Sequence, residues 1–447
     1  MASIVGSQYG FFAPQGTTLN VVFSTDGTNV PAAISGVFNL EVITSPTGVS
    51  VSLPSGYQGV ATFPGGTGQS LNLALGNVNV ADTGTSDTIT AGAGNSSIGG
   101  GKFDTITGGT GTQFIDGTAG SESITGGSSG NETIWGGAGD TINGGGANVT
   151  IGGAVGDTLI GGTGIDFIDG TKGGQSIVIG SGGNETIFSA ASDTINGGGA
   201  ATVIIGGVAG NTITGGTGTE TIDGSLGGQL ITGGSTGSEL IFEGAGDTIF
   251  GGGATDTIGG AKNVTVTGGT GTQFIDGSAG SQSITGGSAG AETIWGGAGD
   301  TIKGGAGNVT IGGAANDTIT GGTGTEFIDG GKGSQLITVG SAGAETIYGG
   351  NNDTFVGGAA QGLIGFLTTP GAQAEFFSDN GTTAATAVDT IGGFSQANGD
   401  FILLNGQSVA PVVASAATAN GNTTITFADG SKLTLLGITS VNSSFFK

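Results

Sequence analysis

An apolar residue, most often isoleucine, recurs every eight to ten residues between Ile89 and Phe355. Glycine pairs stand between most of these positions, and polar residues flank the isoleucines. This alternation predicts short β-strands that each turn one apolar side chain inward, with Ile98, Ile151 and Ile160 among the inward residues. One buried residue per strand cannot close a core alone, so the strands must stack on copies of themselves. The pattern therefore predicts an all-β fold, a parallel β-solenoid.

A longer period lies within the short one. The sequence Phe-Ile-Asp-Gly occurs at Phe114–Gly117, Phe167–Gly170, Phe274–Gly277 and Phe327–Gly330, and Thr221–Gly224 is a fifth, altered copy. Successive copies are 53 or 54 residues apart, and each superrepeat of about 53 residues holds six strands. Internal duplication of a six-strand block explains this spacing.

Six strands per superrepeat permit two ways of winding. A two-sided β-roll has two strands per turn, and a three-sided β-helix has three. Grouping the strands in threes keeps the longer and shorter spacings at fixed corners, which favours three sides. A corner can absorb a difference of one residue, so both windings stay open. In either case we expect a right-handed coil, the usual hand of parallel crossovers.

Changes of texture along the chain predict three regions. Residues 1–82 carry short alternating segments separated by prolines and predict a small N-terminal β domain. Residues 83–358 predict the solenoid, with about 31 short strands. Residues 359–447 lose the period and gain phenylalanine, which predicts a separate C-terminal cap. The expected fold is thus a solenoid flanked by small β domains.

Acidic residues stand at a fixed place in this pattern, two residues before the inward apolar residue. They are Asp87, Asp104, Glu122, Glu132, Asp140, Asp166, Glu185, Asp193, Glu220, Glu239, Asp247, Asp256, Glu292, Asp300, Asp317, Glu326, Glu345 and Asp353. Stacked strands would place these carboxylates in columns about 5 Å apart, where like charges repel. Bridging cations or full solvation would relieve that repulsion. Oxygen ligands without nitrogen or sulfur suit Ca²⁺. The alternative is that the acids are solvated corner residues that keep the chain soluble.

The glycines and acids together resemble the nonapeptide G-G-x-G-x-D-x-U-x of RTX calcium-binding proteins. Gly161–Ile168 fits it fully, and Gly99–Ile106, Gly152–Leu159, Gly251–Ile258 and Gly312–Ile319 fit it nearly. The resemblance implies Ca²⁺ as cofactor and aspartate ligands. The expected ligands are Asp104, Asp140, Asp157, Asp166, Asp256, Asp300, Asp317 and Asp353.

The resemblance reaches into the predicted cap. Asp389–Phe394 and Gly399–Leu404 look like the closing segment of RTX proteins. It implies type I export with an uncleaved C-terminal signal, and folding on Ca²⁺ outside the cell. The absence of an ordinary signal peptide in Met1–Asn20 agrees with that expectation. Alphaproteobacterial surface-layer proteins look similar in their RTX part.

Composition narrows the function. The chain has a formal net charge of -26, no histidine and no cysteine, and its seven basic residues are all lysine. Nucleic-acid binding lacks its basic surface, and no apolar run is long enough to span a membrane. We expect no enzyme, because the acids recur in every superrepeat whereas a catalytic site occurs once. The alternatives are a polysaccharide-active β-helix enzyme and an ice-binding solenoid.

The function expected from the sequence is structural. We expect an extracellular protein that self-assembles as a surface layer, matrix filament or adhesin. The expected partners are copies of the same chain, bound through residues 1–82 and 359–447, and a cell-surface polysaccharide. No nucleic acid is expected as a partner.

Overall fold

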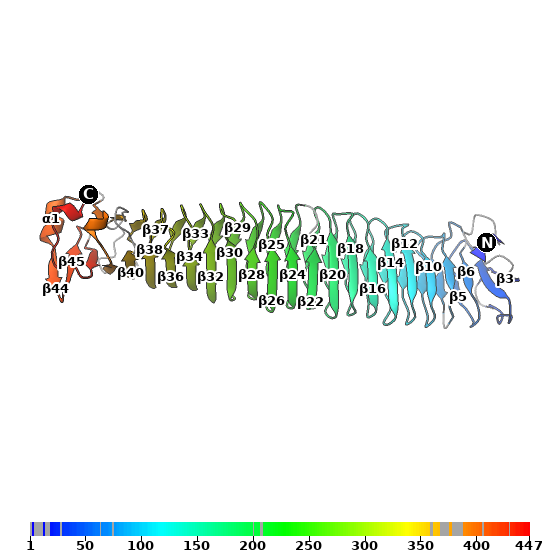
Figure 1. Ribbon diagram of the computed structural model, residues 1–447. Helices are drawn as coiled ribbons and strands as arrows, with labels where there is room; N and C mark the ends of the chain where they lie inside the picture. Colours follow the sequence, from blue (N-terminus) through cyan, green and yellow to red (C-terminus); the bar gives the residue numbers. More distant parts are fainter. Residues whose placement is uncertain are drawn as a thin grey trace. The chain divides into compact units, whose positions relative to one another are not determined.

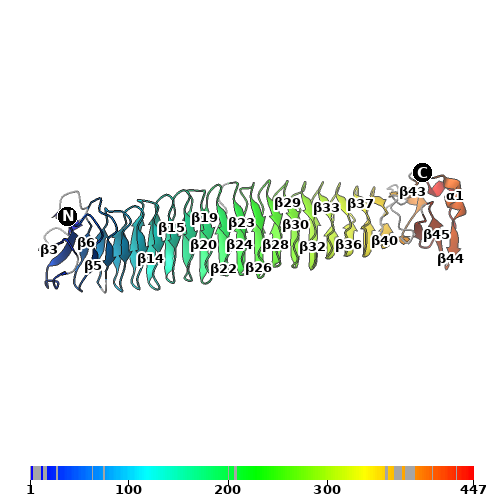
Figure 2. The same cartoon turned by 180° about the vertical axis from the view of Figure 1, so that it is seen from behind.

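The computed structural model describes residues 2–3, 12–13, 18–26, 29–62, 64–73, 76–199, 201–205, 209–357, 361–366, 375–377, 388–404, 406–428 and 430–447. The chain forms two compact units, Met1–Ile222 and Asp223–Lys447. Both consist almost entirely of parallel strands in two sheets, here called the first sheet and the second sheet. Within each unit the strands follow one another in sequence order, and from β4 to β43 successive strands alternate between the two sheets (Figure 1 and, from behind, Figure 2).

In the first unit, the first sheet contains β3 (Leu19–Ser24), β4 (Phe38–Ile43), β6 (Gly59–Ala61), β8 (Asn79–Ala81), β10 (Ser96–Gly99), β12 (Gln113–Gly117), β14 (Asn131–Gly136), β16 (Asn148–Gly152), β18 (Asp166–Gly170), β20 (Asn184–Ser189) and β22 (Ala201–Ile205). The second sheet contains β5 (Ser50–Ser52), β7 (Ser70–Asn72), β9 (Thr88–Thr90), β11 (Thr105–Thr107), β13 (Ser123–Thr125), β15 (Thr141–Asn143), β17 (Thr158–Ile160), β19 (Ser176–Val178), β21 (Thr194–Asn196) and β23 (Thr212–Thr214). The short β1 (Ala2–Ser3) and β2 (Phe12–Ala13) pair antiparallel, and β24 (Thr219–Asp223) contains the boundary between the units.

In the second unit, the first sheet contains β26 (Ser238–Phe242), β28 (Thr255–Gly259), β30 (Gln273–Gly277), β32 (Ala291–Gly296), β34 (Asn308–Gly312), β36 (Thr325–Gly330), β38 (Ala344–Gly349), β40 (Gln361–Phe366) and β42 (Val388–Gly392). The second sheet contains β25 (Leu230–Thr232), β27 (Thr248–Phe250), β29 (Thr265–Thr267), β31 (Ser283–Thr285), β33 (Thr301–Lys303), β35 (Thr318–Thr320), β37 (Leu336–Thr338), β39 (Thr354–Val356), β41 (Glu375–Phe377) and β43 (Phe401–Leu403).

The register of the strands shows two strands per turn. Ile98 of β10 lies opposite Ile115 of β12, which lies opposite Ile134 of β14. In the second sheet, Ile106 of β11 lies opposite Ile124 of β13. The fold is thus the two-sided β-roll, and six strands make three turns. The preference for three sides drawn from loop lengths was wrong, because corners with glycine in the left-handed region, such as Gly130 (φ 98°), accommodate the extra residue of the longer turns.

The core is the narrow space between the two sheets. The inward isoleucines, including Ile98, Ile115 and Ile151, are fully buried as predicted. One prediction was wrong by a single residue: Leu159 of β17 is the buried residue, and Ile160 lies half-buried on the outer side of that strand. Because side chains alternate along a strand, two adjacent apolar residues leave the inward one undecided from sequence.

The stack begins before residue 83. Strands β6, β8 and β10 pair in parallel, as do β5, β7 and β9. Ala61 lies opposite Ala81, and Leu71 lies opposite Ile89. The change in sequence pattern near residue 82 therefore reflects different loops on the same two sheets. The predicted N-terminal domain is not separate, because its described strands form the first turns of the solenoid.

Parallel pairing also continues beyond residue 358, through β40 and β42 in the first sheet and β41 and β43 in the second. The remaining elements of the cap are η1 (Gln396–Asn398), α1 (Val409–Ala414), β44 (Ala417–Ala419), β45 (Asn422–Thr426), β46 (Lys432–Leu435) and η2 (Ser443–Phe445). Here β44, β45 and β46 pair antiparallel, and β46 joins the first sheet beside β42. Phe394 and Phe445 stack with their ring centroids 5.5 Å apart and are both buried. Within the described residues, no helix is long and apolar enough to cross a membrane.

Candidate metal centre

The acids two residues before each inward apolar residue are buried inside the roll. At most 4% of any of them is exposed: Asp87, Asp104, Glu122, Glu132, Asp140, Asp157, Asp166, Glu185, Asp193, Glu220, Glu239, Asp247, Asp256, Glu292, Asp300, Asp317, Glu326, Glu345 and Asp353. Residues two apart on a strand face the same side, so an inward isoleucine implies an inward acid. The alternative that these acids are solvated corner residues is therefore excluded.

One row of acids lies at the corner that leads into the second sheet. Asp140 shows the repeated arrangement: its Oδ2 accepts a hydrogen bond from the Gly137 amide at 2.7 Å, and its Oδ1 accepts one from the Glu122 amide of the neighbouring turn at 2.8 Å. The same pair of bonds recurs at Asp104, Asp157, Asp193, Asp247, Asp300, Asp317 and Asp353. Each aspartate thus ties its own corner to the next turn.

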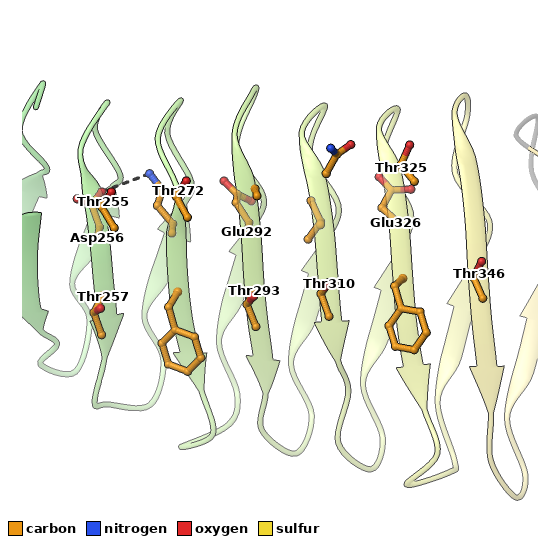
Figure 3. A pocket seen from close by; sticks show the side chains of 16 residues that line it. Thr255, Asp256, Thr257, Thr272, Glu292, Thr293, Thr310, Thr325, Glu326 and Thr346 are labelled. Atoms are coloured by element: carbon orange, nitrogen blue, oxygen red, sulfur yellow. Dashed lines mark hydrogen bonds between the residues drawn. The ribbon is translucent and has the colours of Figure 1, made fainter.

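A second row lies at the corner that leads into the first sheet. Asp166 accepts a bond from the Gly162 amide at 2.6 Å, and Glu292 accepts one from the Gly287 amide at 2.7 Å. Figure 3 shows this row in the second unit, where Asp256, Glu292 and Glu326 follow one another along the stacked strands near the corner. Glu292 and Glu345 bond the amide five residues earlier, whereas Glu220 and Glu326 bond the amide four residues earlier, as Asp166 does.

Many carboxylate oxygens in these rows have no hydrogen-bond donor. Both oxygens of Glu122 and one oxygen each of Asp87, Glu185 and Glu345 are buried without a partner. Burial raises the pKa of Glu122 to about 9, and repulsion from Asp140 and Asp104 adds to it. Burial likewise raises the pKa of Glu345 to about 9, with Glu326 as the next cause. These rows are therefore costly when ionised, and they favour either protons or bound cations.

The donor set fits Ca²⁺. The polar side chains in the rows offer oxygen atoms as metal ligands, from carboxylates, amides and the Ser96 hydroxyl, and the corners between strands offer glycine carbonyls. Hard oxygen ligands with several negative charges are what Ca²⁺ requires, and the bound ion would supply the positive charge that the seven lysines cannot. The unpaired oxygens of Glu122 and Glu185 show that the rows hold coordination capacity that backbone amides do not use.

The eight predicted ligands are divided between the two rows. Asp104, Asp140, Asp157, Asp300, Asp317 and Asp353 lie in the row at the second sheet, and Asp166 and Asp256 lie in the row at the first sheet. The structure brings Asp140 beside Asp157, and Asp300 beside Asp317, because the amide of the first donates to Oδ1 of the second in each pair.

Three buried acids, Glu41, Asp82 and Glu243, were not identified from the sequence. Asp82 and Glu243 stand two residues after an inward residue, Val80 and Ile241 respectively, and are also buried. Their position has the same parity as the inward residue, which is the signal that could have identified them.

Comparison with known proteins agrees with this geometry. The model of the RTX calcium-binding nonapeptide repeat matches four copies, at residues 98–128, 151–174, 286–308 and 311–334. The chain carries RTX calcium-binding repeats. Its cofactor is therefore Ca²⁺. No curated protein and no solved structure matches the chain.

The RTX copies contain some of the predicted ligands and not others. Asp104, Asp157, Asp166, Asp300 and Asp317 lie within the matched RTX segments. Asp140, Asp256 and Asp353 lie outside them but occupy the same two rows. All eight predicted ligands therefore occupy equivalent places in the stacked turns, although not every turn has the full RTX sequence.

Proposed function

We propose that the chain is a secreted, Ca²⁺-stabilised structural protein that assembles with copies of itself as a surface layer, matrix filament or adhesin. The observation that carries the proposal is the repetition of the same buried carboxylate corner on a two-sided roll with RTX repeats. RTX repeats are typical of secreted proteins. A roll whose acids need a cation suits a chain that reaches abundant Ca²⁺ only outside the cell.

Electron microscopy of the purified full chain tests assembly. We expect ordered filaments or sheets with millimolar Ca²⁺ and dispersed particles with chelator, because acidic surfaces repel one another unless cations bridge them. Light scattering at high concentration provides the second readout. A species that stays monomeric with Ca²⁺ would contradict self-assembly and leave a soluble adhesin or an enzyme.

The contacts between copies are proposed to involve residues 1–82 and 359–447, some of which lie outside the described residues. In the described part, β3 is the first strand of the parallel series and exposes 62% of Phe23. The cap differs from the sequence-based picture, because Phe394, Phe401, Phe427 and Phe445 are buried in its own interior. Strand addition at β3 is therefore the favoured contact.

We propose type I export for the chain, with the signal in the cap. Deleting residues 406–447 keeps the parallel strands through β43 and removes the antiparallel part of the cap. We expect the shortened chain to stay in the cytosol of a host with a type I system. Secretion of the shortened chain in normal yield would contradict this export route.

An enzymatic role is not proposed. Buried acids recur in most of the described turns, and their oxygens are occupied by backbone amides or enclosed between the sheets. Catalysis needs a distinct constellation that a substrate can reach, and polysaccharide-active β-helices often use arginine or histidine there, which the chain lacks.

A cell-surface polysaccharide is proposed as a partner of the outer face of the first sheet. In the second unit a groove of about 590 Å³ follows this sheet and includes Thr257, Phe274, Thr293, Thr310 and Phe327. Figure 3 shows the threonines of the groove on successive strands. Aromatic rings and hydroxyl groups in a row suit sugar rings. Pull-down with insoluble polysaccharide, compared with the Phe274→Ala variant, tests this partner.

Ice binding is the second candidate because of the outer face of the second sheet. In the first unit a row of hydroxyl side chains runs along successive paired strands: Ser70, Thr88, Thr105, Ser123, Thr141, Thr158, Ser176, Thr194 and Thr212. No aromatic or acidic residue interrupts this row between Ser70 and Thr212. Thermal hysteresis of the purified protein would favour ice binding over assembly.

A further inference from the structure

One turn near the start of the stack departs from the repeat in a way that changes its chemistry. The second residue after an inward residue of the first sheet is usually glycine, as at Gly100, Gly117 and Gly136. That place faces the interior: a Cβ on Gly136 would lie 2.8 Å from Ile142 Cδ1 and 2.9 Å from Asp157 Oδ2. After Val80 of β8 the same place holds Asp82, which adds a carboxylate that the repeat does not provide.

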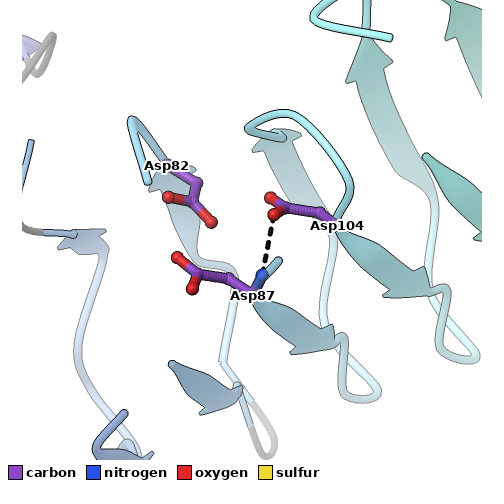
Figure 4. A group of neighbouring side chains, drawn as sticks. All are labelled: Asp82, Asp87 and Asp104. Atoms are coloured by element: carbon purple, nitrogen blue, oxygen red, sulfur yellow. Dashed lines mark hydrogen bonds between the residues drawn. The ribbon is translucent and has the colours of Figure 1, made fainter. Parts of the chain in front are cut away.

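Asp82 meets two carboxylates of the row at the second sheet. Oxygens of Asp82, Asp87 and Asp104 all lie within 4.8 Å of one another, and at most 7% of each residue is exposed. Figure 4 shows the three side chains converging from neighbouring corners. Within the described part of the chain, this is the one group of three or more acids that meets so closely.

Hydrogen bonds hold the three groups in place but leave oxygens free. Asp82 Oδ1 accepts bonds from the Thr62 hydroxyl and the Gly84 amide, and Asp87 Oδ1 accepts one from the Gln69 amide. Both oxygens of Asp104 accept backbone amides. In contrast, Asp82 Oδ2 and Asp87 Oδ2 are buried without any donor. Two enclosed acceptors beside a third carboxylate require a positive partner or a proton.

A bound cation explains this arrangement of three carboxylates better than protons shared among them. Oxygens bound to one Ca²⁺ at 2.3–2.6 Å lie at most about 5 Å apart, which the group satisfies. Three ionised carboxylates at that distance repel by several kcal/mol near a protein surface, by order of magnitude.

We propose that Asp82, Asp87 and Asp104 bind one divalent cation of the Ca²⁺ class, at a site where Asp82 adds a third carboxylate to two neighbours of the row at the second sheet. The proposal rests on the Ca²⁺-stabilised roll proposed above and adds a nonrepeating site with three carboxylates. Asp82 and Asp87 lie before the first matched RTX segment, which begins at residue 98. The ion binds more tightly there than at corners with two carboxylates, and it fixes the turns on which the RTX segment stacks.

Thermal unfolding of the full-length Asp82→Asn variant tests the site. Asparagine keeps an oxygen for the Thr62 hydroxyl and the Gly84 amide, so those bonds survive. In chelator we expect the variant to melt at or above the wild-type temperature, because one buried negative charge is gone. In Ca²⁺ we expect it to melt below wild type. A purely structural role predicts the same loss in both conditions, and that result would overturn the proposal.

A matched variant and a direct measurement complete the test. Asp169→Asn removes one charge from a partly exposed turn of the same unit, where Asp169 accepts a hydrogen bond from the Thr171 amide. We expect its effect on the melting temperature to have the same sign in chelator and in Ca²⁺. In crystals soaked with Tb³⁺, we expect an anomalous peak among the three carboxylates that disappears in Asp82→Asn. Peaks at RTX corners without one here would overturn this site alone. The absence of all peaks would instead contradict the Ca²⁺-stabilised roll.

Discussion

At the scale of single residues, parity along the strand decides which side chains are buried. The acids before each inward isoleucine share its side of the strand, which the sequence already shows. Treating them as solvated corners ignored this parity, and Asp82 and Glu243 were missed for the same reason. The sequence could not show which oxygens would remain without donors, because that depends on how each glycine corner turns its amides.

The burial of these acids has a consequence for pH. Burial raises the pKa of Asp104 to about 8, and the pKa values of Glu122 and Glu345 to about 9. Folding thus favours their protonated forms. The stability that they contribute is present below their unfolded pKa, about 4, and is lost as pH rises through 8 to 9. We expect the melting temperature in chelator to fall steadily between about pH 5 and pH 9, as measured by calorimetry. A rise over that range would contradict the burial of the rows.

Glu122 offers a test at one position, since neither of its oxygens has a donor. Burial and the neighbouring Asp140 raise the pKa of Glu122 to about 9, so this carboxyl must take up a proton when the chain folds at about pH 8, and glutamine removes that cost. We expect Glu122→Gln to raise the free energy of unfolding in chelator by about 1–3 kcal/mol at about pH 8. Gln175 occupies the equivalent place in another turn, where its amide donates to the Ala154 carbonyl. Gln175→Glu is the matched reversal and should lower stability; equal effects of the two changes would refute the argument.

At the scale of strands and turns, the spacing of isoleucines predicts where the strands lie but not how many strands make one turn. Short strands follow from glycine corners and single isoleucines, and the structure has them where the period predicts. The number of sides depends on how the corners accommodate extra residues. Because glycines in the left-handed region, such as Gly120 and Gly130, allow corners of different length, loop length alone does not reveal the number of sides. At Leu159 and Ile160, two adjacent apolar residues concealed the inward one.

Neighbouring residues of β15 separate packing from surface effects. Ile142 is fully buried and Thr141 is exposed on the outer face. We expect Ile142→Ala to lower the free energy of unfolding by about 2–4 kcal/mol, because it leaves a cavity between the sheets. Thr141→Ala should change it by less than about 0.5 kcal/mol. Denaturant unfolding in Ca²⁺ gives both values, and similar losses would contradict the assigned inward side.

At the scale of the whole molecule, charge connects the fold to its environment. The formal net charge of -26 counts every acid as ionised. Buried carboxyls with raised pKa values make the Ca²⁺-free protein less negative than that, because some of them keep protons near neutral pH. Ca²⁺ binds the ionised form, so metal binding and proton loss are coupled.

This coupling predicts that Ca²⁺ binding releases protons at about pH 7. Titration calorimetry in buffers of different ionisation enthalpy measures the release. We expect the apparent binding enthalpy to change linearly with buffer enthalpy, with a slope that means net release. The slope should shrink above about pH 9, where the most shifted acids are already ionised. A slope of zero at neutral pH would show that the rows are ionised before the metal binds.

We propose that the buried carboxylate rows make the stability of this roll depend on Ca²⁺. Thermal unfolding of the full chain at about pH 8, in chelator and in millimolar Ca²⁺, tests it most directly. We expect a clearly higher melting temperature in Ca²⁺, because each site at a free Ca²⁺ concentration a hundredfold above its dissociation constant adds about 2.7 kcal/mol to the free energy of unfolding. Mg²⁺ at the same concentration should raise it less, because it demands stricter geometry. Equal melting temperatures in chelator and in Ca²⁺ would contradict the account.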